Sequence, residues 1–316
     1  MHEQAKRLRV VCRRARPAEE RAVSEFLNYL INGTLSGLLY ALIAMGFVVI
    51  YRASKVFNFA QGELVVFGGY MVWWTLIQLG LPLWIGIPLA FFASAVFGLL
   101  IERIFFSRLV GESVFSMVMV TIGLLILIRG LVLLLFGPQS RPFPIIFPLQ
   151  PIIVGDVIIS RAMLYGGALT ILIGVFLSWF FNRTRVGLRM TAVAEDLQVA
   201  MSLGISVQRS IAFAWLLGAM LSTMGAMVHL SGRSINMLSS DIGMAALPVA
   251  LLAGLESLAG LLLAGVVVGI VQGLASAYLD PIVGGAVGSV LPFVLMLLVL
   301  LIRPTGMFGW KTIERV

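Results

Sequence analysis

Three polar side chains lie close together in one apolar stretch and could contact a polar solute. The stretch V-F-N-F-A-Q-G-E-L-V-V-F-G-G-Y contains Asn58, Gln61 and Glu63. Acidic residues are scarce around it, since only nine Asp or Glu lie between positions 26 and 302. A carboxylate at bilayer depth costs roughly a few kcal/mol, so it usually faces a protein interior or a water-filled cavity. We predict that these three side chains, with Gly62 between them, line a path through a membrane.

A second polar stretch interrupts an apolar run in the C-terminal half. The run covers positions 241–279, and its 39 residues are too many for one ordinary crossing. The break reads G-L-E-S-L-A-G and contains Glu256 and Ser257. Interrupted helices that occur once in each half of a chain indicate a central transport site. We therefore predict two interrupted helices, and we add Glu256 and Ser257 to the predicted solute path.

One arginine, Arg129, lies inside the apolar run 113–136. It could line the path and meet an anionic solute. Alternatively, its long side chain could reach the nearer membrane interface or pair with a local carboxylate. The residue types leave these alternatives open.

The elements that must position these residues are transmembrane helices. The chain has 316 residues, of which 60% are hydrophobic and 11% charged, and its mean hydropathy is +1.06. A soluble domain carries roughly a quarter charged residues. Several apolar runs reach the ~20 residues that cross a hydrocarbon core. We predict an all-α polytopic bundle of about eight to nine spans. Glycines that recur every four residues, at 33 and 37 and again at 265, 269 and 273, predict close helix contacts.

The same composition excludes several classes of function. Seven of the 22 basic residues lie in the first 21 positions and most others flank apolar runs, which indicates membrane topology and not nucleic-acid binding. One cysteine and two histidines provide neither a disulfide nor a metal site. The phosphate-binding loop G-x-x-x-x-G-K-[ST] is absent from the sequence, so any ATP hydrolysis must occur on another chain. We predict a non-catalytic chain without a metal or cofactor of its own.

The chain divides into two tails and one membrane domain. We assign 1–25 to a basic N-terminal tail, 26–309 to a single transmembrane domain and 310–316 to a C-terminal tail. The positive-inside rule places the arginine-rich segment 183–209 in the cytoplasm. Within it, the apolar spacing predicts one short amphipathic helix over 190–203, stopped by Gly204. This helix is either a simple connector or a docking site for a soluble partner.

The side of the membrane on which the N-terminus lies stays open. With the loops around Arg103, Arg183 and Arg303 in the cytoplasm, two spans between Lys55 and Glu102 place the N-terminus outside. The seven basic residues of the N-terminal tail favour the inside. Either the first polar stretch is re-entrant or the tail is translocated.

Four motifs in this order resemble the permease subunits of branched-chain amino acid ABC importers, of the Liv H type. They are N-G-T-L-S-G-L-L-Y-A-L-I-A-M-G-F, N-F-A-Q-G-E, R-M-T-A-V-A-E-D-L-Q-V-A-M-S-L-G-I and R-P-T-G-M-F-G. Together they extend over most of the chain after about position 26, whereas the N-terminal tail is longer than is usual in this family. Similar permeases serve urea, short amides and other small solutes, and the resemblance does not separate these substrates.

The resemblance implies a set of partners in the plasma (inner) membrane of a prokaryote. These are a second homologous permease, two cytoplasmic ATPase subunits that bind ATP and Mg²⁺, and a periplasmic or lipid-anchored solute-binding protein. The residues that match the segment engaged by the ATPase are Ala194, Glu195, Asp196, Leu203 and Gly204. The implied mechanism is alternating access. A self-sufficient secondary transporter or channel, with Glu63 or Glu256 as a proton or cation site, is the alternative.

Overall fold

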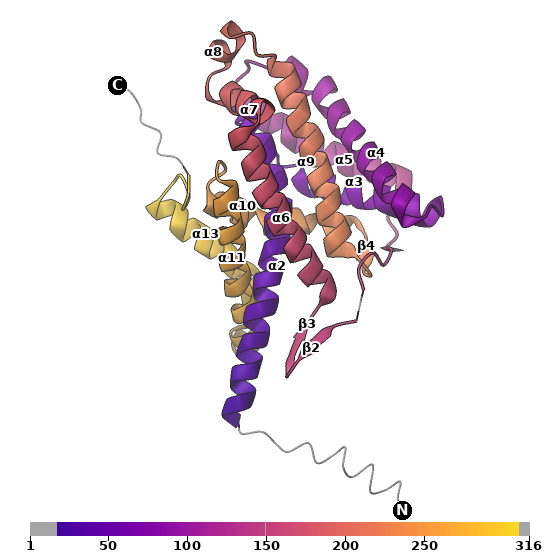
Figure 1. Ribbon diagram of the computed structural model, residues 1–316, viewed down its shortest axis with the longest axis vertical. Coiled ribbons are helices and arrows are strands. Elements are labelled where there is room, and N and C mark those ends of the chain that lie inside the picture. The colour runs from indigo at the N-terminus through magenta and orange to yellow at the C-terminus, as the bar shows by residue number, and fades with distance from the viewer. Residues whose placement is uncertain (1–17, 149, 310–316) are drawn as a thin grey trace, which may run out of the picture.

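The computed structural model describes residues 18–148 and 150–309 (Figure 1). Within these ranges the chain is a mostly helical bundle, as the composition predicts. Six helices are long and apolar enough to cross a membrane. They are α2 (Ala18–Ser54), α4 (Leu83–Ile104), α5 (Val114–Phe136), α6 (Arg161–Arg183), α9 (Val207–Leu230) and α11 (Leu258–Tyr278).

Shorter elements complete the described chain. The helices are α3 (Gln61–Trp73), which continues as the π-helix η1 (Trp74–Gln78), α7 (Arg185–Glu195), α8 (Leu197–Ser202), α10 (Asp241–Ala253), α12 (Asp280–Val283), α13 (Val287–Ile302) and the 3₁₀ turns η2 (Phe106–Arg108) and η3 (Met237–Ser240). The strands are β1 (Arg141–Pro142), β2 (Ile152–Val154), β3 (Val157–Ile159) and β4 (Ser234–Ile235). β1 pairs antiparallel with β4, and β2 pairs antiparallel with β3.

The predicted count of eight to nine spans is not confirmed, because α3, α10 and α13 fall short of a full crossing. Both predicted interruptions exist. The chain leaves α2 at Ser54 and re-enters a helix only at Gln61, and a second break separates α10 from α11. Each interruption is followed or preceded by a helix of 13 residues, about 20 Å long at 1.5 Å per residue. Each of these two helices therefore covers about two-thirds of the ~30 Å hydrocarbon core.

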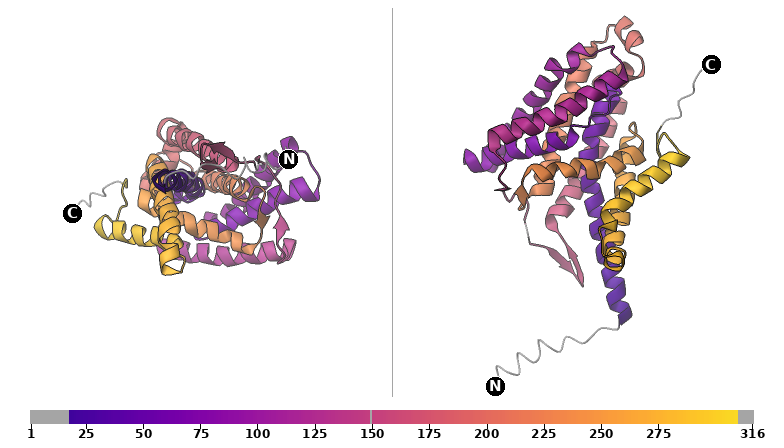
Figure 2. Two further views of the ribbon diagram at one scale, coloured as in Figure 1. Left: turned by 90° about the horizontal axis from the view of Figure 1, so that it is seen from below. Right: turned by 180° about the vertical axis from the view of Figure 1, so that it is seen from behind.

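Helix α2 occupies the centre of the bundle, and α6, α9, α10 and α11 pack around it (Figures 1 and 2). The glycine pattern is confirmed at its contact with α11. A Cβ atom added to Gly37 would lie 2.0 Å from the carbonyl oxygen of Gly265, and one on Gly269 would lie 2.2 Å from that of Gly33. Only glycine permits this backbone approach. The close packing fixes α11, and hence the break before it, against α2.

The two ends of α2 lie at opposite ends of the bundle. Its C-terminal end adjoins the α7–α8 segment, whereas its first turns, which include residues 18–25 of the predicted tail, lie at the other end (Figure 1). Thus α2 begins on the side opposite to segment 183–209. The rest of the predicted N-terminal tail and residues 310–316 lie outside the described residues.

Candidate functional site

The first polar motif begins with a local turn that starts α3. Asn58 is 1% exposed, and its Oδ1 accepts a hydrogen bond from the backbone N–H of Ala60 at 3.0 Å. Such an Asx turn satisfies one of the free donors before a helix. The side chain of Asn58 also donates to Gln61 Oε1 at 3.5 Å. Asn58 therefore shapes the entry into α3 from within the protein.

Gln61 and Gly62 fix α3 against its neighbours. The amide of Gln61 is fully buried and donates to Ser222 Oγ on α9 at 2.9 Å and to the carbonyl oxygen of Ile43 on α2 at 3.4 Å. A Cβ on Gly62 would lie 2.4 Å from the carbonyl oxygen of Ser240, so α3 crosses η3 at backbone contact. These two residues thus have clear packing roles in this structure. Their predicted place in a solute path stays a prediction.

Glu63 forms the polar centre of the motif, with a partner 66 residues away. Arg129 on α5 donates to Glu63 Oε1 from Nε at 2.9 Å and from Nη2 at 2.6 Å. The same Nη2 donates to Ser240 Oγ at 3.1 Å. We call these three residues the Glu63–Arg129–Ser240 cluster. Of the alternatives for Arg129, the structure has the ion pair with a nearby carboxylate.

The cluster borders a small hollow between α3, α5 and the start of α10. Its cavity volume is about 50 Å³, and Gly62, Asp241 and Met244 are among its other lining residues. A single water needs roughly 10–15 Å³ of such volume, so the hollow has room for a few waters but not for an amino acid. Glu63 Oε2 is buried without a hydrogen-bond partner among the described residues. An opened form of this hollow would present one free carboxylate oxygen beside a guanidinium.

Glu256 and Ser257 do not lie in this hollow. They follow the far end of α10, whose first turn adjoins the cluster. Ser257 is the N-cap of α11, where its Oγ accepts the backbone N–H of Gly260 at 3.0 Å. Glu256 Oε1 lies 2.5 Å from Lys55 Nζ. The two polar interruptions therefore meet each other at this ion pair, and only the first of them contributes to the hollow.

Lys55 also contacts the predicted coupling segment. Its Nζ lies 3.2 Å from Glu195 Oε1 at the end of α7. Burial alone would lower the pKa of Lys55, but hydrogen bonds to Glu256 and Glu195 outweigh it and raise this pKa above its ordinary value. We call Lys55, Glu195 and Glu256 the Lys55 junction. The sequence contained all three residues but no spacing that would have grouped them.

The coupling segment is two helices, and the prediction of one helix over 190–203 is wrong. Asp196 has an extended conformation, and its Oδ1 accepts the backbone N–H groups of Gln198 and Val199, each at 2.9 Å. It therefore caps α8 and separates it from α7. The last two residues of α7 are Ala194 and Glu195. The predicted stop is confirmed, because Gly204 has a φ of 74° just after α8. Leu203 beside it is 72% exposed.

Comparison with known proteins identifies the family of this bundle. Residues 29–300 match the family model described as "Branched-chain amino acid transport system / permease component". The chain belongs to this permease family. It is 30% identical over 310 residues to the high-affinity branched-chain amino acid transport system permease protein BraD of Pseudomonas aeruginosa, with 93% of this chain and 99% of BraD covered.

Two further relatives agree with this assignment. The permease protein LivH of Salmonella typhimurium is 30% identical over 307 residues, which cover 92% of this chain and 98% of LivH. A probable branched-chain amino acid transport permease protein, LivH of Methanocaldococcus jannaschii, is 24% identical over 298 residues, which cover 88% and 91%. The chain is therefore an ABC importer permease, a transport component that works with ATPase and binding-protein partners. The alternative of a self-sufficient transporter gains no support.

Proposed function

We propose that this permease carries a branched-chain or related amino acid across the plasma (inner) membrane of a prokaryote. Relatives that are similar over nearly their whole length have branched-chain amino acid transport in their names. The complete importer would contain a second homologous permease and two cytoplasmic ATPase subunits that bind ATP and Mg²⁺. A periplasmic or lipid-anchored solute-binding protein would deliver the amino acid.

The Glu63–Arg129–Ser240 cluster is the proposed contact point for the solute. A free amino acid carries one carboxylate and one ammonium group, and the cluster holds one guanidinium and one carboxylate. The side chain of Arg129 is 47% exposed, whereas that of Glu63 is only 2% exposed. When α3 and α5 separate, Arg129 would pair with the carboxylate of the solute, and Glu63 would accept its ammonium group. The closed hollow would then be the occluded empty state.

The Lys55 junction is the proposed link between ATP-driven motion and this cluster. Lys55 joins the end of α7 to both interruptions, and these adjoin α3 and α10. The other end of the path is the cluster, which contains Glu63 from the first turn of α3 and Ser240 from the turn before α10. A displacement of α7 and α8 by a bound ATPase would therefore reach both α3 and α10. This is the observation that carries the proposal of alternating access.

The test is ATP-driven uptake by the complete complex in proteoliposomes. Glu63→Gln removes the charge and keeps most of the shape, so we expect assembly with the ATPases but uptake reduced at least tenfold. Glu112→Gln, the same substitution at an exposed glutamate just before α5, is the matched control and should keep uptake. Normal uptake of radiolabelled leucine by the Glu63 variant would contradict the proposed contact. A purified chain that never retains ATPases would contradict the importer complex itself.

A further inference from the structure

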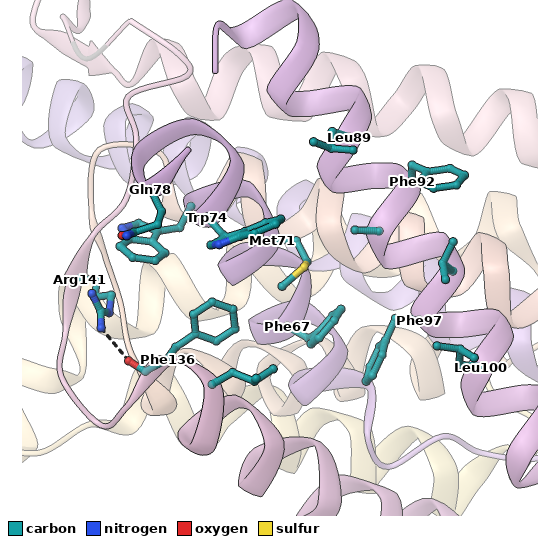
Figure 3. A pocket seen from close by; sticks show the side chains of 14 residues that line it. Phe67, Met71, Trp74, Gln78, Leu89, Phe92, Phe97, Leu100, Phe136 and Arg141 are labelled. Atoms are coloured by element: carbon teal, nitrogen blue, oxygen red, sulfur yellow. Dashed lines mark hydrogen bonds between the residues drawn. The ribbon is translucent and has the colours of Figure 1, made fainter. Parts of the chain in front are cut away.

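A long apolar groove lies between α3, α4 and α5, separate from the Glu63–Arg129–Ser240 cluster. Its volume is about 910 Å³. Phenylalanine, leucine and methionine side chains line most of its length, and Gln78 and Arg141 lie at one end beside Trp74 (Figure 3). Leu100 lies at the other end of the view. The groove is thus apolar along its length and polar at one end.

The polar end contains hydrogen-bond donors that lack acceptors. Arg141 donates from Nη2 to the carbonyl oxygen of Phe136 at 2.8 Å, and its guanidinium lies 4.7 Å over the ring of Trp73. Arg141 Nε and Trp73 Nε1 are both buried without a partner among the described residues. The side chain of Trp73 lines the groove and is only 5% exposed. Since buried donors are almost always satisfied, this end has the chemistry of a site for a ligand with several acceptor oxygens and a negative charge.

The length of the apolar part matches one leaflet of a membrane. From Phe67 to Gln78 the lining of α3 and η1 extends over eleven residue-to-residue steps, or about 16 Å at helical rise. Half of a hydrocarbon core is about 15 Å. At the inner end, the rings of Phe67 and Phe97 stack with centroids 3.7 Å apart. On α4, which is a candidate membrane span, the groove-lining side chain of Phe92 is 66% exposed.

We propose that this groove binds one anionic phospholipid. Its phosphate lies at Arg141 and Gln78, and one acyl chain follows α3 and α4 toward Phe67. The lipid belongs to the leaflet opposite the coupling segment, because Leu100 at the other end of the groove also lines a hollow with Ser206 and Arg209 of that segment. Charge complementarity decides for a lipid over a second permease, since Arg141 has no carboxylate within salt-bridge distance among the described residues. The proposal does not depend on which solute is transported.

The test is lipid retention by the full-length chain, followed by native mass spectrometry. Detergent-purified protein is titrated with phosphatidylglycerol and, separately, with phosphatidylcholine of the same acyl chains. We expect one phosphatidylglycerol to be retained with at least tenfold preference over phosphatidylcholine. Arg141→Gln should abolish this preference, since a hydrogen bond to a charged group is worth about tenfold or more in affinity. Arg161→Gln, an arginine at the start of α6, is the matched control and should keep it.

A second variant tests the acyl-chain part without changing the charge. Ala93 lines the groove, so Ala93→Phe should fill it and lower retention of phosphatidylglycerol about tenfold. The control is Leu172→Phe on the exposed face of α6, where the side chain is 67% exposed. This pair of variants also decides the matter if Arg141→Gln fails to fold.

Three results would overturn the proposal. Equal loss of lipid in Arg141→Gln and Arg161→Gln would show only a general charge effect. Displacement of phosphatidylglycerol by inorganic phosphate, with no effect of Ala93→Phe, would show a free-anion site. A photo-crosslinker at Phe92 that links the complex to a second permease instead of a lipid would show that protein covers the groove.

Discussion

The ion pair between Glu63 and Arg129 predicts unequal costs for the loss of each partner. Arg129→Gln would remove the guanidinium that pairs with Oε1 of the buried Glu63 carboxylate. Its other oxygen, Oε2, already has no hydrogen-bond partner among the described residues. Removal of one partner from a buried ion pair costs about 3–5 kcal/mol. Glu63→Gln would leave Arg129 with Ser240 Oγ as a remaining hydrogen-bond partner, and its side chain is 47% exposed and not enclosed within this chain. That loss should cost only about 1 kcal/mol, the typical net worth of one hydrogen bond.

The double variant separates the cost of leaving the Glu63 charge buried and unpaired from the other effects of each substitution. Glu63→Gln in the background of Arg129→Gln removes the uncompensated charge, so it should restore about 2 kcal/mol of the free energy of unfolding. The assay is unfolding of the purified chain in mixed micelles with a rising fraction of dodecyl sulfate. Arg161→Gln serves as a control for the loss of a positive charge near a helix end. Equal costs for the two single variants, or strict additivity in the double variant, would refute the reasoning.

Four further predictions concern the Lys55 junction, the coupling segment and the centre of the bundle. Lys55→Met should keep assembly with the ATPases but lower solute uptake per ATP hydrolysed at least fivefold in proteoliposomes, whereas Lys55→Arg should retain most of this coupling. Unchanged coupling in Lys55→Met would contradict the proposed connection between α7 and the helix interruptions. Because the pKa of Lys55 is raised, its stabilising effect is fully present below the ordinary lysine value of about 10.4 and is lost as the pH rises through the higher folded-state pKa. Wild-type stability should therefore fall more than that of Lys55→Met above about pH 10.5, and parallel pH profiles would exclude this. Gly37→Ala should lower the free energy of unfolding by about 1–3 kcal/mol, because the new methyl group collides with α11. Gly123→Ala, where nothing lies within 4 Å of the new methyl group, should be neutral or slightly stabilising, and equal effects of the two variants would contradict the packing. Asp196→Ala should cost about 1 kcal/mol of α8 stability and raise the rate of backbone amide hydrogen exchange in α8, whereas Asp196→Asn should largely preserve the cap. An unchanged exchange rate in the alanine variant would count against the cap.

The sequence predicts the polar features of this bundle well because they contrast with their surroundings. Glu63 and the two helix interruptions stand out in apolar runs, where every polar residue needs a reason. The pairing of Glu63 with Arg129 could not be derived, since 66 residues separate them and no periodicity relates α3 to α5. Arg129 stands out from the sequence by its position inside an apolar run alone. Ser240 gave no signal, because a serine at the start of a helix is common.

The coupling segment shows where pattern reasoning fails. The apolar positions of 190–203 fit one helical face, but Asp196 changes the local backbone and ends α7. A signal was present, since an aspartate is among the preferred residues at a helix N-cap. The predicted span count is not confirmed for a related reason. Hydropathy measures the length of an apolar run, and it does not report that α3 and α10 each cover only part of the membrane thickness.

The arrangement of α3 and α10 explains why their interruptions lie at the Lys55 junction. A continuous helix from α2 into α3 would hold Glu63 rigidly to the centre of the bundle, and a continuous α10–α11 helix would do the same for Ser240. The breaks at 55–60 and 254–257 end helical continuity between α2 and α3 and between α10 and α11, although α10 still packs on both α2 and α11. Gly33, Gly37 and their partners lock α2 to α11. Lys55 connects the two breaks to α7 through ion pairs. Lys55 has a φ of 53°, a left-handed conformation that costs a non-glycine residue about 1–2 kcal/mol. The hydrogen bond from its backbone N–H to the carbonyl oxygen of Tyr51 and its two ion pairs offset that cost. In the proposed cycle a motion of α7 would reach α3 and α10 through Lys55 and not through a continuous helix.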